Sequence, residues 1–201
     1  MRHAVKDKLR VVFDGGAAFK GTSLNSQLLQ GPDLMNGLIG VLMRFRMEHV
    51  AITGDLECMY YQVRVPEHQR KYLRFVFWEE GDISLPPVDF EMCVHVFGAL
   101  SSMGCVNYAL RQTAEDNETT YGLEAANTLK NDFYVDDMTK SVVSDTKGIE
   151  LIHNMISLCE AGGFNLNKIA SNSKVVMETV PEEKRSKSSK KLQLNELISC
   201  C

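Results

Sequence analysis

The sequence predicts an α+β fold, in which helices and antiparallel strands follow one another irregularly. Residues 32–47 carry apolar side chains at helical spacing, and residues 88–93 alternate apolar and polar side chains, as a strand with one solvated face does. The predicted order is strand, helix, strand, hairpin, helix, hairpin, helix and strand, which differs from the strand–helix repeat of a parallel sheet. With 201 residues, 44% of them hydrophobic, the chain is long enough to bury one compact core.

The first half of the chain contains four predicted strands and one helix. Pro32 suits the first position of the helix at 32–47, which follows a loop that extends to Gly31. The acidic residues 79–82 form a predicted turn between the last two strands, which therefore make a hairpin. The strands are predicted over residues 9–13, 50–55, 73–78 and 88–93.

The second half of the chain combines predicted helices with a second hairpin. Ser101 and Ser102 suit the N-cap of the first helix, and Gly162-Gly163 suits the end of the last one. Asp136 and Asp137 form a tight turn within the hairpin, and a final strand follows the last helix. The helices are predicted over residues 99–115, 121–131 and 149–159, and the strands of the hairpin over residues 133–135 and 138–143.

Charge and composition narrow the classes of function. The formal net charge of −4 disfavours general phosphate binding, although Lys and Arg gather near both ends of the chain. No run of about eighteen apolar residues occurs, so we expect no membrane span and no membrane partner. The polar start lacks a secretory signal, so we expect an intracellular location, in the cytoplasm, with the nucleus as the alternative.

Two further features concern the cysteines and the C-terminal end. The six cysteines lack the spacing of a zinc site, which indicates free thiols in a reducing compartment. Residues 175–201 lose apolar periodicity and are rich in Lys, Ser and Glu, so we expect a weakly ordered, charged tail.

The carboxylates at two predicted strand ends are the candidates for chemistry. Asp55 ends an apolar strand, and Asp136 and Asp137 lie at the tip of an apolar hairpin about eighty residues later. Mg²⁺ needs only one or two protein carboxylates, and two such ions can support phosphoryl transfer. Because adjacent strand side chains point to opposite faces, we expect Asp136 to face Asp55, with Asp137 in support. The alternative is that the Asp-Asp pair is ordinary turn chemistry.

Three ordered motifs resemble those of reverse transcriptases. Tyr134-Val-Asp-Asp137 (YVDD) resembles their catalytic hairpin, Asp55-Leu56-x-x-x-Tyr60-x-Gln62-Val63 resembles their first catalytic motif, and Phe97-Gly98-Ala-Leu-Ser-Ser102 resembles the motif that contacts template and nucleotide. Further segments are similar to polymerases of BEL/Pao-type LTR retrotransposons, a class of transposable element. They include Lys20-Gly-x-Ser-Leu-Asn25, Leu29-Gln-Gly-Pro-Asp-Leu34, Leu42-x-Arg-Phe-Arg46 and Gly163-Phe-x-Leu-x-Lys168-x-x-Ser-Asn172.

The resemblance covers roughly residues 8–174 and implies a fold. That fold is a right-hand polymerase palm, an antiparallel sheet backed by helices, with part of the fingers and no thumb. The implied fingers-like segments are about 1–30 and 63–97, and the palm-like segments are about 31–62 and 98–174.

The resemblance also implies metal ligands. Asp55 and Asp136 would hold two Mg²⁺ ions, Asp137 would assist them, and the backbone carbonyl of Leu56 would join them. Mn²⁺ is the alternative ion.

The same resemblance assigns residues to the nucleotide, each with a plainer alternative. Arg10 would meet the triphosphate, and otherwise is a solvated charge at a strand edge. Tyr60 would exclude a 2′-hydroxyl, and otherwise is a core aromatic. Phe97 and Gly98 would lie beside the nascent base pair. Lys168 would supply charge or a proton to pyrophosphate, and otherwise is a surface lysine.

The implied activity is RNA-directed DNA polymerisation, a nucleotidyl transfer from dNTPs to a primer 3′-OH. The implied partners are a primer-template of RNA and DNA, dNTPs, and either a second copy of the chain or a thumb or RNase H segment supplied elsewhere. The alternatives are an inactive retrotransposon remnant, at most a nucleic-acid-binding fragment, and a metal-dependent hydrolase or calcium-loop protein. The calcium loop is disfavoured because the Asp-Asp hairpin lacks its D-x-D-x-D-G pattern.

Overall fold

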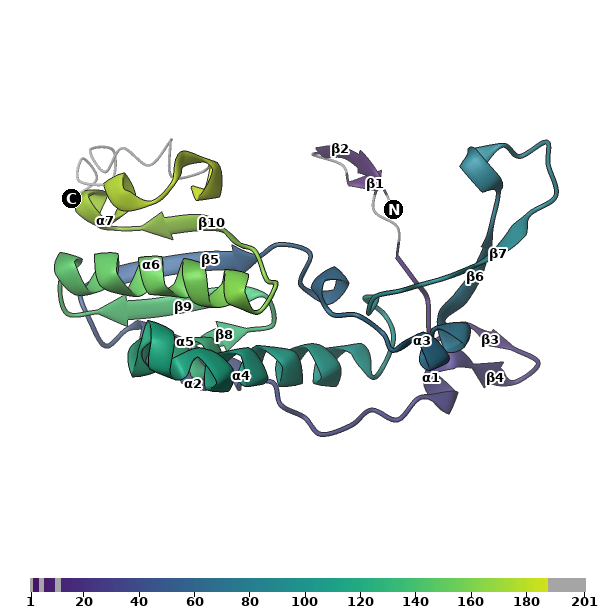
Figure 1. The fold of residues 1–201 in the computed structure, drawn as a ribbon, viewed down its shortest axis with the longest axis horizontal. Coiled ribbons are helices and arrows are strands. Elements are labelled where there is room, and N and C mark those ends of the chain that lie inside the picture. Colours follow the sequence, from purple (N-terminus) through teal and green to yellow (C-terminus); the bar gives the residue numbers. More distant parts are fainter. Residues whose placement is uncertain (1, 4–5, 10–11, 188–201) are drawn as a thin grey trace, which may run out of the picture. The chain divides into compact units, whose positions relative to one another are not determined.

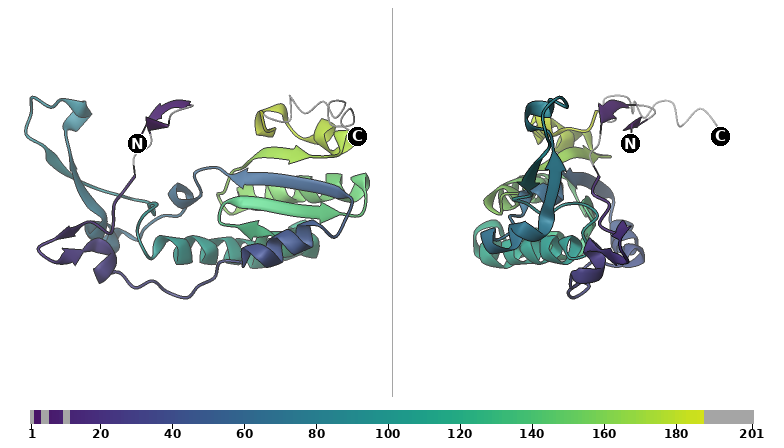
Figure 2. Two further views of the ribbon diagram at one scale, coloured as in Figure 1. Left: turned by 180° about the vertical axis from the view of Figure 1, so that it is seen from behind. Right: turned by 90° about the vertical axis from the view of Figure 1, so that its right-hand side faces the viewer.

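The computed structural model describes residues 2–3, 6–9 and 12–187. Packing divides the chain into two compact units, each of which is made of two segments (Figures 1 and 2). Unit 1 contains Met1–Leu34 and Tyr60–Asn107, and unit 2 contains Met35–Met59 and Tyr108–Cys201.

Unit 2 is built on a four-stranded antiparallel sheet with the strand order β10-β5-β9-β8. The strands are β5 (Val50–Leu56), β8 (Phe133–Tyr134), β9 (Asp137–Val142) and β10 (Leu166–Ser171). The accompanying helices are α2 (Leu38–Phe45), α5 (Leu123–Asn131), α6 (Asp145–Ala161), α7 (Lys174–Thr179) and the short 3₁₀ helix η4 (Glu182–Lys184), and helix α4 (Ser102–Tyr121) begins in unit 1 and continues into unit 2.

The core of unit 2 lies between the sheet and helix α6, which runs along one face of the sheet (Figure 1). Strand β5 alternates buried and half-buried residues, which is the pattern that period-two packing against one layer produces. Each large aliphatic side chain that is fully buried contributes about 1.5–3 kcal/mol. The largest such side chains of unit 2, methionines included, are Ile52, Leu56, Met59, Leu129, Met138, Ile152, Met155, Leu158, Leu166 and Ile169.

The described residues of unit 1 form three small hairpins and several short helices. Its longest hairpin pairs β6 with β7, and most of the side chains on this hairpin are exposed. The strands are β1 (Arg2–His3), β2 (Lys6–Leu9), β3 (Ala18–Phe19), β4 (Thr22–Ser23), β6 (Arg74–Phe77) and β7 (Val88–Glu91). The helices are α1 (Leu24–Gln27), η1 (Met59–Gln62), α3 (Glu67–Arg70), η2 (Lys71–Leu73) and η3 (Glu79–Gly81).

The prediction of an α+β fold with antiparallel sheets is confirmed. The apolar strand before Asp55, both predicted hairpins and the helices of the second half are all present, with ends that differ by a few residues. No helix in the described part of the chain is long and apolar enough to cross a membrane.

Two predicted elements of the first half are wrong. The strand predicted over 9–13 is absent from residues 12–13, and β2 instead ends at Leu9, with residues 10–11 outside the described chain. The helix predicted over 32–47 begins only at Leu38. The reason is that Asn36 uses its side-chain amide to bond the carbonyls of Lys130 and Phe133, which holds the preceding segment in an extended path.

The loop predicted to extend to Gly31 contains regular structure. The β3–β4 hairpin leads directly into α1, whose first turn is closed by reciprocal bonds between Ser23 and Ser26. The loop was predicted from the Gly, Ser and Asn content of the segment, and this content does not reveal such local bonds.

The prediction of a weakly ordered tail is wrong for residues 175–187. Helix α7 packs against α6 and β10, and Val176 and Val180, four residues apart, are both buried. The Ser173 hydroxyl caps the helix by accepting a bond from the Val176 amide. Residues 188–201 lie outside the described chain.

We predict that Gly148→Ala destabilises the protein by about 1–3 kcal/mol. A Cβ at this position in α6 would lie 2.8 Å from Cγ2 of Val176, so the overlap outweighs the usual gain from replacing a helical glycine. Urea denaturation should show a lower midpoint, and adding Val176→Ala should cost less than the sum of the two single changes.

The matched control is Gly40→Ala in α2. Its Cβ would meet only Nη1 of Arg44, at 3.4 Å, so this change should stabilise the protein by about 0.5–1 kcal/mol. Shifts of the same sign for the two alanine variants would contradict the packing of α7 on α6.

Candidate functional site

The register of three strands in unit 2 places three polar residues in one row. Asp55 of β5 pairs with Asp137 of β9 on one side and with Asn167 of β10 on the other. Residues directly opposite one another share a face of the sheet, with Cβ atoms about 4.5–5.5 Å apart. The row lies where β5 ends and β9 and β10 begin, so its side chains are at the edge of the core.

The tip of the β8–β9 hairpin is strained and tied to β5. Val135 has a φ of 57°, a conformation that β-branched residues rarely adopt. The Leu56 amide donates a hydrogen bond of 2.8 Å to the Asp136 carbonyl, which joins the turn to the end of β5.

The register adds Asp137 to the prediction that Asp136 faces Asp55 with Asp137 in support. Asp137 is the residue directly across from Asp55, because the two-residue turn of Val135 and Asp136 makes Tyr134 and Asp137 the closing pair of the hairpin. Asp136 occupies the turn beside them.

A β-bulge brings Lys168 to the same row. The pairing of β10 with β5 shifts between Asn167 and Ala170, and Lys168 has a φ of 50°. Its amide donates to Oδ1 of Asn167, and its Nζ lies 2.7 Å from Oδ2 of Asp55. The Lys168 side chain is 60% exposed, so this ion pair contributes at most about 1 kcal/mol to stability, and its effect is on the charge of the site.

Asp137 lies among other negatively charged side chains. Burial raises the pKa of Asp137 above its ordinary value, the charges of Asp136 and Asp55 raise this pKa further, and Lys168 opposes them. The three carboxylates therefore interact electrostatically, and a cation beside them would relieve their repulsion.

The donor set suits a hard divalent cation, although it is not a preformed cage. Carboxylate oxygens are the ligands that such cations take, and two of these residues face each other across the ladder. Among the described residues, no three His, Cys, Asp or Glu side chains already converge on one point. Any ion would therefore draw additional ligands from water or substrate.

An ion cluster around the buried Asp132 carboxylate lies at the base of the β8–β9 hairpin. The Asp132 carboxylate, 3% exposed, lies 2.7 Å from Nε of Arg44 and 2.9 Å from Nζ of Lys140. The Asp132 carbonyl also accepts a bond from the Thr139 amide. Only the carboxylate is buried, and removing either of its partly exposed partners would leave it with one counter-charge at the start of β8.

A second set of predicted residues comes together within unit 1. The rings of Tyr60 and Phe97 meet edge to face with centroids 5.6 Å apart, and the Tyr60 hydroxyl donates to Sδ of Met103 over 3.6 Å. Gly98 follows Phe97 with a φ of 107°, and a Cβ there would lie 2.1 Å from the Phe13 carbonyl. Only glycine fits at this position. The predicted residue Arg10 lies outside the described chain.

Two polar residues of these sites had no role in the sequence prediction. Asn167 stands across from Asp55 only because of the strand register, which single-sequence patterns do not reveal. Asn25 contacts the Phe97–Leu100 loop from a distant segment, and its place in the Lys20–Asn25 motif was the one signal available.

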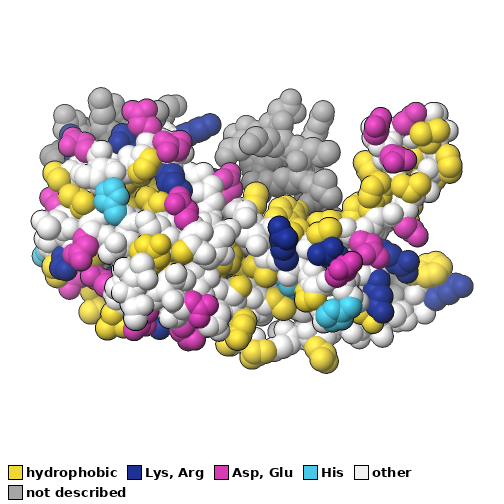
Figure 3. All heavy atoms as spheres, in the orientation of Figure 1, with side chains coloured by type: hydrophobic (Ala, Val, Ile, Leu, Met, Phe, Trp, Pro, Cys, Tyr) yellow, Lys and Arg dark blue, Asp and Glu magenta, His cyan; other side chains and the backbone are white. Residues whose placement is uncertain are grey.

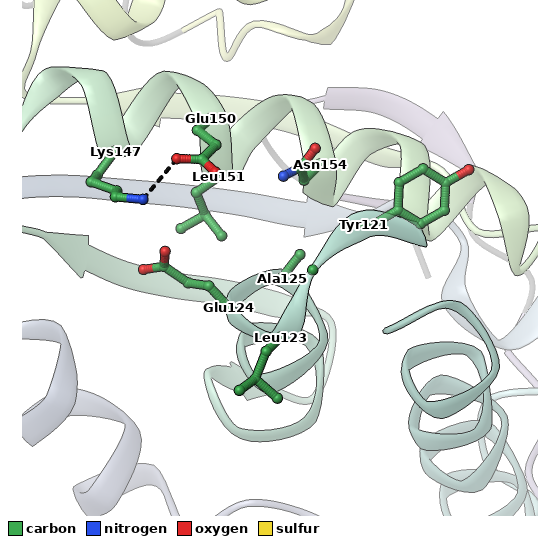
Figure 4. Close-up of a pocket in the computed structure, with 9 residues that line it drawn as sticks. Tyr121, Leu123, Glu124, Ala125, Lys147, Glu150, Leu151 and Asn154 are labelled. Carbon is green, nitrogen blue, oxygen red and sulfur yellow. Dashed lines mark hydrogen bonds and ion pairs between the residues drawn. The ribbon is translucent and has the colours of Figure 1, made fainter. Parts of the chain in front are cut away.

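A cavity of about 190 Å³ in unit 2 contains none of the predicted site residues (Figure 4). It lies between the α4–α5 junction and α6, with Tyr121 and Asn154 on its wall and the Lys147–Glu150 ion pair at its edge (Figure 4). Its mixed charges resemble an ordinary solvated surface, so we assign it no chemistry.

We predict that Asp137→Asn raises the melting temperature at neutral pH by at most about 1 °C, because solvent screens the charges around this exposed residue. Because its pKa is raised in the folded state, ionising Asp137 costs the wild type stability as pH rises from about 4 through that raised value. Asparagine does not ionise, so the gain should shrink as pH falls toward 4. Thermal melts across this range are the measurement.

Asp89→Asn is the matched control, since this exposed strand residue faces Val76 across its ladder, with no second acid opposite. A gain in the Asp137 variant that persists unchanged at pH 4 would contradict the proposed crowding of charge.

Comparison with known proteins supports the architecture. No family model and no curated protein sequence matches the chain. Among solved structures, the chain is similar to a foamy viral protease-reverse transcriptase (dRH) in complex with double-stranded DNA, with 14% identity, a TM-score of 0.59 and coverage of 80% of this chain and 24% of that one. It is also similar to the foamy viral protease-reverse transcriptase in complex with an RNA/DNA hybrid, with 13% identity, a TM-score of 0.50 and coverage of 67% and 16%.

The chain thus spans about a quarter or less of the length of these structures. At such identities the likeness concerns the fold alone. The chain therefore has a reverse transcriptase-like fold, in which the β10-β5-β9-β8 sheet and its helices form a partial palm.

Proposed function

We propose that the chain is the core of an RNA-directed DNA polymerase from a BEL/Pao-type retroelement. The observation that carries this proposal is the row across the sheet, which sets Asp55 opposite Asp137 with Asp136 in the adjoining turn. The motif resemblance and the reverse transcriptase-like fold are independent support.

In this proposal Asp55, Asp136 and Asp137 hold two Mg²⁺ ions, or Mn²⁺ in their place, together with the backbone carbonyl of Leu56. Bound there, the ions would activate the primer 3′-OH and neutralise charge on the leaving pyrophosphate. The raised pKa of Asp137 supports this assignment, since crowded carboxylates favour a bound cation. The residues present fit the ions by donor chemistry.

The remaining residues would act on the nucleotide. Lys168, whose ammonium is held at the row by the bulge, would lie near the triphosphate and supply positive charge or a proton. Tyr60 would exclude a 2′-hydroxyl, and Phe97 and Gly98 would border the new base pair. Arg10 would bind the triphosphate through its planar guanidinium.

Nucleic acid would be held mainly through its phosphates. On the face shown in Figure 3, Lys and Arg side chains gather over α3 and the β3–β4 hairpin in unit 1. The basic residues of these elements and of the adjoining η2 and β6 are Lys20, Arg70, Lys71 and Arg74. Such a local basic region offsets the net charge of −4 as an argument against phosphate binding. A thumb or RNase H segment supplied elsewhere, or self-association, would complete the grip on primer and template.

We predict that the protein extends a DNA primer on an RNA template when Mg²⁺ and dNTPs are present. Asp55→Asn, Asp136→Asn and Asp137→Asn should each lower the rate at least about a hundredfold, because even indirect partners of metal ligands cost ten- to a hundredfold. Single-turnover extension with excess protein is the measurement. The same variants should lose the rise in melting temperature that Mg²⁺ gives the wild type.

Asp145→Asn, in the first turn of α6, is the control and should extend the primer at the wild-type rate. A folded wild type that fails to extend the primer would remove the polymerase activity. Salt-dependent binding of the primer-template without extension would then identify a non-catalytic nucleic-acid-binding fragment.

A further inference from the structure

Asn25 of α1 makes a two-point clamp on a distant loop of unit 1. Its Nδ2 donates to the Gly98 carbonyl over 3.0 Å, and its Oδ1 accepts a bond of 2.8 Å from the Leu100 amide. Its own backbone amide donates to the Gly15 carbonyl over 2.8 Å. The side chain thus fixes both ends of a three-residue stretch, and its backbone is itself anchored to a third segment.

The clamped loop has little room to move in the position that it occupies. A Cβ at Gly15 would lie 2.6 Å from the Gly98 carbonyl and 2.8 Å from Oδ1 of Asn25. Ala99, between the two clamped residues, is buried. Gly98 is in the left-handed region and lies against the Phe13 carbonyl, so the clamp holds a conformation that most residues disfavour.

Gly98, one of the two residues that Asn25 holds, directly follows Phe97 of the Tyr60–Phe97 ring contact. Phe97 precedes Gly98 and is 61% exposed, so burial does little to hold its ring. Its edge-to-face contact with Tyr60 depends on where the backbone at Gly98 lies. Releasing that backbone would free Phe97 and would remove one of the contacts that hold the ring of Tyr60, beside the bond of its hydroxyl to Met103.

We infer that Asn25 is a positioning residue for nucleotide selection. This inference rests on the proposed polymerase function, in which Tyr60 excludes ribonucleotides and Phe97 and Gly98 border the new base pair. Asn25 touches no substrate in this role, and it acts by holding the Phe97–Leu100 backbone so that the Tyr60 ring stays at one place.

An asparagine is the side chain that this geometry requires. The clamp needs one donor for the Gly98 carbonyl and one acceptor for the Leu100 amide, at the reach of a short side chain. Aspartate retains the acceptor for Leu100 and sets a carboxylate oxygen against the Gly98 carbonyl, and alanine loses both bonds. The two variants therefore separate the contact with Gly98 from the contact with Leu100.

The experiment compares kcat/KM for a dNTP with that for the matching rNTP in wild type, Asn25→Asp and Asn25→Ala. Losing two hydrogen bonds should lower the dNTP/rNTP ratio about fivefold to thirtyfold in Asn25→Ala. Asn25→Asp should lower it at least as much, because a carboxylate oxygen would stand against the Gly98 carbonyl. The KM for dNTP should rise more than kcat falls, and the Kd for the primer-template should stay within about twofold of the wild type.

Asn172→Ala is the matched control. Asn172 makes the same pair of bonds in unit 2, from Nδ2 to the His49 carbonyl over 2.9 Å and to Oδ1 from the Ala51 amide over 2.8 Å. Asn172→Ala should lower the stability of the protein about as much as Asn25→Ala does, and it should leave the dNTP/rNTP ratio unchanged. An equal fall in both alanine variants would overturn the inference, because it would mark a general effect of destabilisation.

Hydrogen exchange of the protein alone tests the clamp without any polymerase activity. The Leu100 amide should lose protection in Asn25→Ala and retain it in Asn25→Asp.

An unchanged dNTP/rNTP ratio in Asn25→Ala, with Leu100 deprotected, would overturn the selective role. A wild type without extension would remove that role together with the proposed function, and unchanged Leu100 exchange in Asn25→Ala would overturn the clamp itself. Should Asn25→Ala fail to fold, Asn25→Asp carries the comparison.

Discussion

The pairing register of β5 with its two neighbours is the constraint on which the site of unit 2 depends. It sets Asn167, Asp55 and Asp137 side by side, and a shift of one residue in either ladder would move one of them to the opposite face. The packing beneath the row keeps that register, since a Cβ at Gly54 would already lie 3.0 Å from Cδ1 of Leu166. The chemistry of the row is therefore specified by the core.

Much of this site was predictable because its parts are local. An apolar run that ends at Asp55, and two short apolar runs on either side of Asp136, are patterns that single-sequence periodicity detects. The choice between Asp136 and Asp137 was not predictable in the same way. It depends on a two-residue turn with Val135 at a positive φ, which a β-branched residue would not suggest.

The features that escaped prediction all depend on long-range polar contacts or on a few buried residues. Asn36 keeps the start of α2 from extending toward Pro32 by bonding two carbonyls almost a hundred residues away. Two valines are enough to dock α7, because Gly148 leaves space for one of them. Neither effect produces a periodic pattern of apolar residues. The apolar pattern therefore predicted too long a helix at α2 and no helix at α7.

The β-bulge in β10 separates the chemistry of this strand from its packing. Lys168 and Ile169 together stand opposite Gly54, and only Ile169 enters the core, where it is fully buried. A one-residue deletion at 168 would leave Ile169 facing Gly54 in a regular ladder, with every other core side chain on its present face. Insertion or loss of a single codon here would thus add or delete the ammonium beside Asp55 while the sheet keeps its shape.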